Sequence, residues 1–519
     1  MRSIRGNAVF LTLAVLFSFQ CRKKSQDEGI LAVIGDRVIT ADEFFRRAEY
    51  TVRPPYCRGD SPQTRSIVLN SLIAEKLYAL EEGDSGALAR SPAFQRYIQG
   101  RKEQFMRQIL LEEATKGKTM PEDSEIRGRT SVAGREYRLS FFTVRRENVG
   151  ALKDWGVNAV RPEFFNDLHE RTGGLGPPPE RIVSWKSPEL PAVHKALFSG
   201  PLRKNQVIGP VDVGEDGYLM MRIIDWSDRP AVSEREMRER FDSVRRRLEE
   251  EKKQAVWDEF VFGLMKGRKL EFQRDPFEKM AELMRAIYMP TKNSRDLFRL
   301  DSLRTGEAPG RLPIDSILAE IRSNRMEGLP FFTFDGRTWT VSDFLKLTAS
   351  HPLVFRKRRM RPGEFPGQFK LAVADLLRDA TVNQEAYHRG MDRLPAVQRE
   401  TIMWSDALLA AYHRHRVLKS RGKAADSAAG ADRNPDRTLG AYTDSLFKAN
   451  SNRIGINVGM LESIRLTRID MVALNRDLPY IETVPVFPAF TARPRLDYGR
   501  RLDRPRADAA SRRRSGGNP

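Results

Sequence analysis

Apolar and polar residues alternate over residues 30–40 (ILAVIGDRVIT), on either side of a Gly-Asp pair. An alternation of period two that is interrupted by a turn signal predicts a β-hairpin. Thr40 ends the second strand and Glu43 follows three positions later, which is the spacing of a helix-capping box. The pattern therefore predicts a hairpin and then a helix over residues 41–52, which ends before Pro54.

The next part of the chain carries apolar side chains at spacings of three and four, which indicates amphipathic helices. Two such helices are predicted, over residues 64–82 and 92–114. Together with the hairpin they form a helical N-terminal unit that we assign to residues 22–125.

The pattern changes over residues 126–230, where short runs rich in β-branched and aromatic residues predict strands. The four predicted strands cover residues 137–144, 181–185, 207–211 and 218–226. Two helices are predicted between them, over residues 162–171 and 190–198. This content predicts a small α+β domain.

A long charged helix is predicted over residues 233–266, and Ser233 with Glu236 forms a second capping box at its start. Apolar residues recur on one face of this helix, so the charged remainder is its solvated face. We expect the whole segment, residues 231–272, to pack back onto the N-terminal unit. Residues 273–330 are expected to be a connecting segment.

An internal repeat follows. Residues 340–344 (TVSDF) match residues 40–44 (TADEF) at an offset of 300, and both follow a turn and a strand. Further on, residues 386–390 echo residues 79–83, and Pro395 echoes Pro92. Residues 331–420 are therefore predicted to be a second copy of the helical unit. Shared helix-capping signals are the alternative explanation.

The remaining residues predict a linker over 421–437, a C-terminal segment of helix and strand over 438–490, and a tail over 491–519. The tail has nine Arg and three Asp without apolar periodicity, which predicts a disordered basic segment. The expected fold class is a multidomain α+β protein, with mostly helical units and one small α+β domain.

The N-terminus indicates export. Arg2 and Arg5 precede an apolar run over residues 8–19, which is too short to span a bilayer and has the layout of a signal peptide. The run ends near Cys21, and in this respect residues 1–21 resemble a bacterial lipoprotein signal, although Gln20 stands where that signal prefers a small residue. The resemblance implies that Cys21 is lipidated and that the protein is anchored to a membrane of the cell envelope, in the periplasm.

Composition narrows the class of function. The chain has 519 residues and a net charge of +20, and its two cysteines exclude a disulfide scaffold or a four-cysteine zinc module. The basic excess by itself suggests nucleic acid or an anionic membrane surface. Export removes the expectation of nucleic acid and favours lipid headgroups and acidic polypeptides. No cofactor or metal is expected: His413 and His415 are two apart on a predicted helix and so face different sides.

The order of these elements resembles the parvulin-type peptidyl-prolyl isomerases of the cell envelope, of the SurA-like, PrsA-like and PpiC kind. Residues 35–40 (GDRVIT) with Glu43 and Phe44 look like the start of their chaperone domain. The parvulin signature is resembled by Ala196-Leu-Phe198, by residues 207–211 (VIGPV) and by Gly217-Tyr218, with residues 173–176 (GGLG) and Trp185 as a looser match.

This resemblance implies a folding factor that binds unfolded or proline-containing exported polypeptides. The residues expected to line its substrate groove are Phe141, Trp185, Phe198, Leu219 and Met220. The family usually has histidines at the positions of Phe141 and Leu219, and their absence puts catalysis in doubt. His169 and His194 do not stand at family positions and are expected to be surface or locally bonded residues.

Two alternatives stay open beside a folding factor that has lost its isomerase activity. One is an active peptidyl-prolyl isomerase. The other is a structural or assembly lipoprotein that binds no clients. The sequence leaves the clients and the oligomeric state undetermined.

Overall fold

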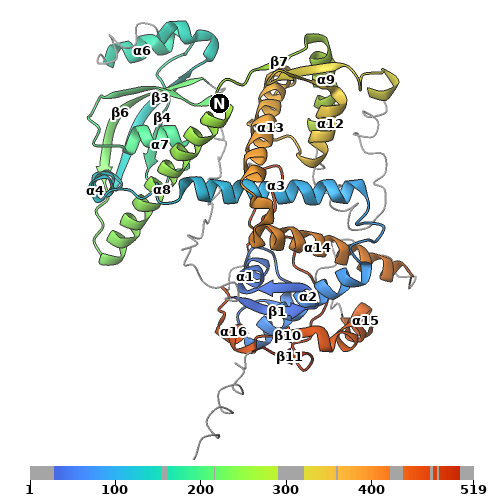
Figure 1. The fold of residues 1–519 in the computed structure, drawn as a ribbon. Coiled ribbons are helices and arrows are strands. Elements are labelled where there is room, and N and C mark those ends of the chain that lie inside the picture. Colours follow the sequence, from blue (N-terminus) through green and yellow to red (C-terminus); the bar gives the residue numbers. More distant parts are fainter. Residues whose placement is uncertain are drawn as a thin grey trace, which may run out of the picture. The chain divides into compact units, whose positions relative to one another are not determined.

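A computed structural model describes residues 29–152, 162–214, 217–289, 321–357, 360–420, 436–467, 471–475 and 478–502. The fold is mixed α and β with helices in the majority, as expected (Figure 1). Contacts divide the described residues into two compact units, one of residues 111–263 and one of residues 29–110 with 264–502. The predicted signal peptide with Cys21 and the end of the predicted tail, residues 503–519, lie outside the described residues. No helix within the described ranges is both long and apolar enough to cross a membrane.

The first unit is built on a four-stranded antiparallel sheet with the strand order β4-β3-β6-β5 (Figure 1). All four predicted strands and both predicted helices are confirmed, with small changes at their ends. The strands are β3 (Arg135–Val144), β4 (Glu180–Ser184), β5 (Val207–Asp212) and β6 (Tyr218–Asp228), and the helices are α6 (Pro162–Arg171) and α7 (Pro191–Phe198).

Each face of this sheet buries its own apolar cluster, because successive side chains of a strand point to opposite faces. Tyr137 and Leu139 of β3 pack with residues of α7 on one face. Phe142 and Val144 of the same strand pack with Phe165 of α6 on the other face. The sheet is therefore covered on both sides, by α7 on one face and by α6 on the other.

Two more helices complete the first unit, α4 (Asp123–Val132) and α8 (Glu234–Met265). The capping box of Ser233 and Glu236 is confirmed, since each backbone N–H meets the other residue's side-chain oxygen at 3.2 Å. Val244 and Leu248 of α8 pack against α4. Residues 270–272, which were expected to belong to this helical segment, instead form a strand of the second unit, because Leu270 and Phe272 alternate with a polar residue.

The second unit begins with the predicted hairpin and helix, β1 (Ile30–Ile34), β2 (Arg37–Thr40) and α1 (Ala41–Glu49). Gly35 forms the turn with a positive φ of 61°, which favours glycine. The Thr40 hydroxyl accepts the backbone N–H of Glu43 at 3.1 Å, as a cap does. The Glu43 carboxylate lies 3.0 Å from the ammonium of Lys76, so the expected reciprocal capping bond is replaced by a buried ion pair.

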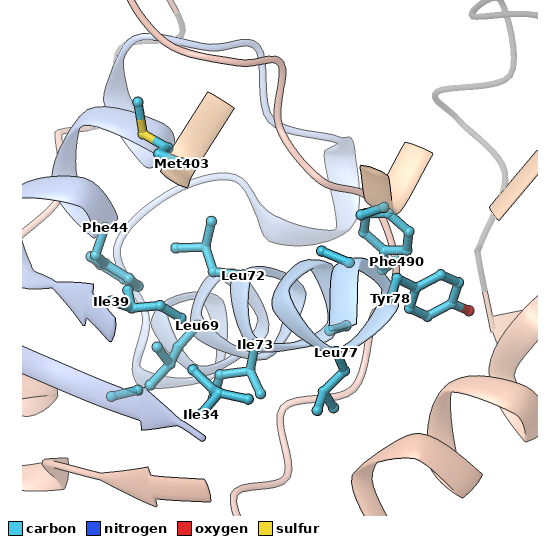
Figure 2. Close-up of a cluster of buried hydrophobic side chains, with 14 of the residues drawn as sticks. Ile34, Ile39, Phe44, Leu69, Leu72, Ile73, Leu77, Tyr78, Met403 and Phe490 are labelled. Atoms are coloured by element: carbon cyan, nitrogen blue, oxygen red, sulfur yellow. The ribbon is translucent and has the colours of Figure 1, made fainter. Parts of the chain in front are cut away.

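Helix α2 (Pro62–Glu82) is buried on nearly all sides and forms the centre of this part of the unit. Figure 2 shows its apolar residues between the hairpin, α1 and side chains from distant parts of the chain. The labelled residues of α2 are Leu69, Leu72, Ile73, Leu77 and Tyr78, and those that pack around them are Ile34, Ile39, Phe44, Met403 and Phe490. Helix α3 (Pro92–Thr115) follows and runs on into the first unit.

The second half of the unit contains a hairpin of the same register. Ala32 pairs with Ile39 in the first hairpin, and Phe332 pairs with Trp339 in the second, with the register shift at the same place. The elements are β8 (Pro330–Phe334), β9 (Arg337–Thr340), α12 (Val341–Ser350), α13 (Phe365–His388) and α14 (Pro395–Ser420).

The segment expected to be only a connector, residues 273–330, contains helix α9 (Arg274–Tyr288) in its described part. Phe277, Met280 and Met284 of α9 lie in one apolar core with Phe331 and Phe344. The helical spacing of these three residues is the signal that the expectation missed. Strand β7 (Leu270–Phe272), just before α9, pairs with β8 and completes the sheet β7-β8-β9.

The C-terminal residues also belong to this unit. They form α15 (Asp436–Ala449), β10 (Ile454–Ile456), α16 (Val458–Ser463) and β11 (Arg500–Arg501), and the strands complete the sheet β11-β10-β1-β2. The expected disorder of the basic tail does not hold for residues 491–502. The Asn70 amide donates to the backbone carbonyls of Arg493 and Arg495 at 2.7 Å, so this stretch is held by its backbone, which a count of charges does not detect. Short 3-10 helices cover Pro55–Cys57, Arg146–Leu152, Pro362–Glu364, Met391–Arg393 and Ser451–Arg453.

Candidate functional site

The predicted substrate groove corresponds to the face of the first sheet that α7 covers. Phe141, Trp185, Phe198 and Leu219 belong to one apolar cluster there. Met220 lies on the opposite face with Phe142 and Phe165, so its assignment to the groove was wrong. The reason is the two-residue period of a strand: Leu219 and Met220 are neighbours on β6 and must face opposite ways.

Phe141 and Leu219 stand on adjacent strands and point to the same side. In the register of β3 and β6, Thr143 pairs with Leu219 and Phe141 pairs with Met221, so the two residues are diagonal neighbours. Leu219 is 6% exposed and Phe141 is half-buried. The Arg181 guanidinium lies over the Phe141 ring, 4.6 Å from its centroid. This corner of the face is therefore apolar with a cation at its rim.

Trp185 marks the other end of the cluster and contacts helix α8. Its indole N–H donates to the Ser243 hydroxyl at 3.0 Å. Phe241, Val244 and Leu248 of α8 pack around it. Helix α8 thus covers the end of the cluster where Trp185 lies, while Phe141 at the other end stays half-buried.

His194 of α7 is fully buried within the same face. Its Nε2 lies 3.2 Å from the carbonyl oxygen of Trp185, and its ring stacks edge-on against Trp185 with centroids 4.6 Å apart. Burial, assisted by the positive charges of Arg247 and Arg129, lowers the pKa of His194 to about 4. The imidazole is therefore neutral near pH 7 and donates Nε2–H to the carbonyl, which makes it a packed core residue bonded within its own segment.

His169 occupies a similar position on the opposite face. Its ring packs against Phe142 at a centroid distance of 5.0 Å, and the residue is buried. Gly174 lies directly against this ring: a Cβ at that position would be 2.2 Å from it. The glycine-rich stretch at residues 173–176 thus allows the loop to close over His169, and it presents no acidic side chain to the site.

The chemistry available on the α7 face follows from these contacts. The four clustered side chains offer apolar surface, and neither imidazole of this unit is placed as an acid or base beside them. Among the described residues, no group of three or more His, Cys, Asp or Glu side chains is arranged to hold a metal ion. Phe198 and Leu219 are buried, so the half-buried Phe141 and Trp185 are the members of the cluster that reach the surface. The exposed Ile182 of the edge strand β4 pairs with Arg138 and faces the other side of the sheet.

A cluster of titratable side chains in the second unit was not foreseen from the sequence. The Glu82 carboxylate lies 3.3 Å from Nδ1 of His413 and accepts a 2.8 Å hydrogen bond from Arg416, while Nε2 of His413 lies 2.7 Å from the Tyr442 hydroxyl. The cluster joins α2, α14 and α15. The hydrogen bond between His413 and Tyr442 links α14 to α15, and the contacts of Glu82 link α14 to α2.

No family model matches the chain, and no curated protein matches it. The function must therefore be inferred from the residues and geometry of this chain.

Proposed function

We propose that the protein is a folding factor of the cell envelope that binds unfolded exported polypeptides, with a parvulin-like domain that has lost its isomerase activity. The observation that carries the proposal is the antiparallel sheet of residues 135–228, with helices between its first three strands. Four antiparallel strands are what the resemblance to parvulins implies, and they occur in the segment that carries the signature residues.

Loss of catalysis is favoured by the side chains at the two histidine positions. Rotation about a prolyl peptide bond has a barrier of about 20 kcal/mol and needs no nucleophile, only a site that binds the twisted amide better than the planar one. Phe141 and Leu219 provide apolar contact and no hydrogen bond at these positions. A site of this kind holds an apolar client segment without selectively stabilising the twisted amide.

The partners follow from charge and location. The net charge of +20 favours encounter with acidic clients and anionic lipid surfaces. The apolar run before Cys21 supports a membrane-anchored lipoprotein that meets clients as they emerge from export. Replacement of Cys21 by Ser tests the anchor: incorporation of labelled palmitate should be lost and the protein should leave the membrane fraction.

The decisive experiment measures suppression of aggregation. An unfolded outer-membrane protein is diluted from urea into buffer with the chain from residue 22 onward, and light scattering is followed. We expect scattering to fall at least twofold at equimolar protein. An unrelated basic protein of similar net charge is the control for non-specific electrostatic binding. No protection at a tenfold excess would overturn the proposal and favour the structural or assembly lipoprotein.

A protease-coupled assay with a proline-containing peptide separates binding from catalysis. We expect no acceleration of isomerisation at micromolar protein. Acceleration above the uncatalysed rate would contradict the loss of activity and favour an active isomerase.

A further inference from the structure

The second unit contains two halves, residues 30–110 (β1 to α3) and residues 330–420 (β8 to α14), and positions in their helices can be matched by counting from equivalent residues. Glu103 stands as far after Pro92, the first residue of α3, as Asp406 stands after Pro395, the first residue of α14. Both acids are largely buried. Glu103 and Asp406 are therefore the same position of the repeated unit.

A second pair of positions corresponds on the preceding helices. Gly83 follows α2 and Gly390 follows α13, and both have a positive φ. Lys76 stands as far before Gly83 as Asn383 stands before Gly390. Lys76 and Asn383 are thus equivalent, and both are buried.

These equivalent residues contact each other across the two halves and not within one half. The Lys76 ammonium lies 3.1 Å from the Asp406 carboxylate, and the Asn383 amide donates to the Glu103 carboxylate at 2.8 Å. The acid on α14, the last helix of the second half, thus contacts α2 of the first half. The acid on α3, the last helix of the first half, contacts α13 of the second half. In Figure 1, α14 accordingly lies along α2.

Further contacts support this arrangement for α3. The Arg107 guanidinium donates to Asn383 at 2.8 Å, and the Gln99 amide lies 2.5 Å from the Tyr387 hydroxyl. Nε2 of His351 lies 2.6 Å from Glu103. Although burial acts in the opposite direction, the hydrogen bond and charge of His351 hold the pKa of Glu103 below its ordinary value. Helix α3 thus packs against side chains of the second half.

The sheets repeat the same relationship. Beside β2, strand β1 pairs with β10, which comes after the second half in the chain, and Ala32 is opposite Ile456. Beside β9, strand β8 pairs with β7, which comes after the first half in the chain, and Phe332 is opposite Phe272. Ala32 and Phe332 are equivalent positions of the two hairpins, and both added strands run antiparallel.

We propose that the two halves are copies of one unit that exchange their last helix and third strand, so that each copy is the binding partner of the other. The surfaces of α2 and α13 then fit a second copy of the unit, which this chain supplies internally. Only the first copy carries the sheet domain of residues 111–263 between its last helix and its added strand. The corresponding stretch of the second copy, residues 421–453, is much shorter and contains α15 in its described part. The inference depends on contacts of the second unit and not on the proposed function.

Crosslinking of half-buried positions tests the exchange. Leu80 and Tyr387 are equivalent, as are Gln99 and Ile402, by the same counting from Gly83, Gly390, Pro92 and Pro395. In a background with Cys57→Ala, the pair Gln99→Cys and Tyr387→Cys is treated with a short bis-methanethiosulfonate reagent. We expect an intramolecular link, identified by peptide mass spectrometry.

The matched controls are the pairs that would touch without exchange, Leu80→Cys with Gln99→Cys and Tyr387→Cys with Ile402→Cys. We expect no link in either. Links in the controls and none in the test pair would overturn the exchange. Links of the test pair between two chains, seen as covalent dimers, would overturn the internal pairing.

A second measurement uses the otherwise unchanged chain, with a specific protease site inserted within residues 290–320. After complete cleavage we expect the two fragments to elute together in gel filtration and to separate in 6 M urea. Separation in buffer without urea would overturn the proposal even if the cysteine variants fail to fold.

Discussion

The Lys76 ammonium of α2 lies 3.1 Å from the Asp406 carboxylate of α14, and both side chains are almost completely buried. Asp406 also accepts a 3.1 Å hydrogen bond from Arg37, and Lys76 also pairs with Glu43 at 3.0 Å. Charges of this kind are stable in a protein interior only while each has its partner. The network therefore makes the packing of α14 on α2 specific.

Removal of one partner should be costly. We expect Asp406→Asn to lower the free energy of unfolding by about 3–5 kcal/mol, because Lys76 and Arg37 lose their shared buried anion. Asp84→Asn is the matched control, since Asp84 pairs with the same Arg37 but its side chain is 65% exposed. It should cost less than about 1 kcal/mol. Urea denaturation followed by circular dichroism measures both, and equal losses would contradict the role given to burial.

The buried imidazole of His194 predicts a loss of stability in acid. Its pKa is lowered to about 4 in the folded state, against an ordinary value of 6.5. Between these values the unfolded chain binds the proton and the folded one does not. The contribution of neutral His194 is therefore complete above pH 6.5 and is lost as the pH falls to 4, by on the order of 3 kcal/mol.

Unfolding free energies at pH 4.5, 5.5 and 7 test this effect. The variant His194→Gln should flatten the pH dependence in this range, while His388→Gln, at an exposed position on α13, should leave it unchanged. An unchanged slope in His194→Gln would show that this imidazole is not kept neutral by burial.

The packing of α8 within the first unit depends on a few apolar residues. We expect Leu248→Ala to destabilise that unit by about 2–5 kcal/mol, because Leu248 is 5% exposed in the cluster with α4. Met237→Ala on the same helix should change stability by less than about 0.5 kcal/mol, since Met237 is 53% exposed. Tryptophan fluorescence during urea unfolding follows this region through Trp185. Similar effects of the two substitutions would argue against the packing of α8 on α4.

The loop at residues 173–176 should tolerate no side chain at Gly174. A Cβ there would lie 2.2 Å from the His169 ring, so Gly174→Ala should cost about 1–3 kcal/mol through overpacking. Gly128→Ala on α4 meets open space and should be neutral or stabilising by up to about 1 kcal/mol. Thermal denaturation of both variants checks the contrast, and a neutral Gly174→Ala would mean that the loop can move away from His169.

Local sequence patterns predicted the helices and strands of this fold better than they predicted which elements pack against each other. The alternation in β3 and the capping residue Thr40 identify a strand and a helix start because both signals act over a few residues. The same period of two would have excluded Met220 from the groove had it been applied to Leu219 and Met220 together. The exchange of α3 and α14 has no local signal, since Lys76 and Asp406 are brought together only by tertiary packing.

The apolar residues of the candidate site could be predicted from the sequence, but which of them helix α8 covers could not. The cluster of Phe141, Phe198 and Leu219 follows from apolar residues on facing elements. The contact between Trp185 and Ser243 could not be predicted, because the sequence of a charged helix does not indicate which part of a distant sheet the helix packs against. The order of residues 491–502 was missed for a similar reason: arginine side chains point outward while the backbone is bound by Asn70.

The position of β10 has a consequence for synthesis. Because Ile34 pairs with Ile454, the first hairpin of the chain acquires its third strand only after almost the whole polypeptide has been made. Contacts of such sequence separation form slowly, since a long loop must close before they contribute. A chain that emerges from its N-terminus, whether from a ribosome or through a membrane channel, must keep residues 30–110 incomplete until the last segment arrives. Residues 30–34, which are made early, are therefore among the last parts of the chain to complete their fold.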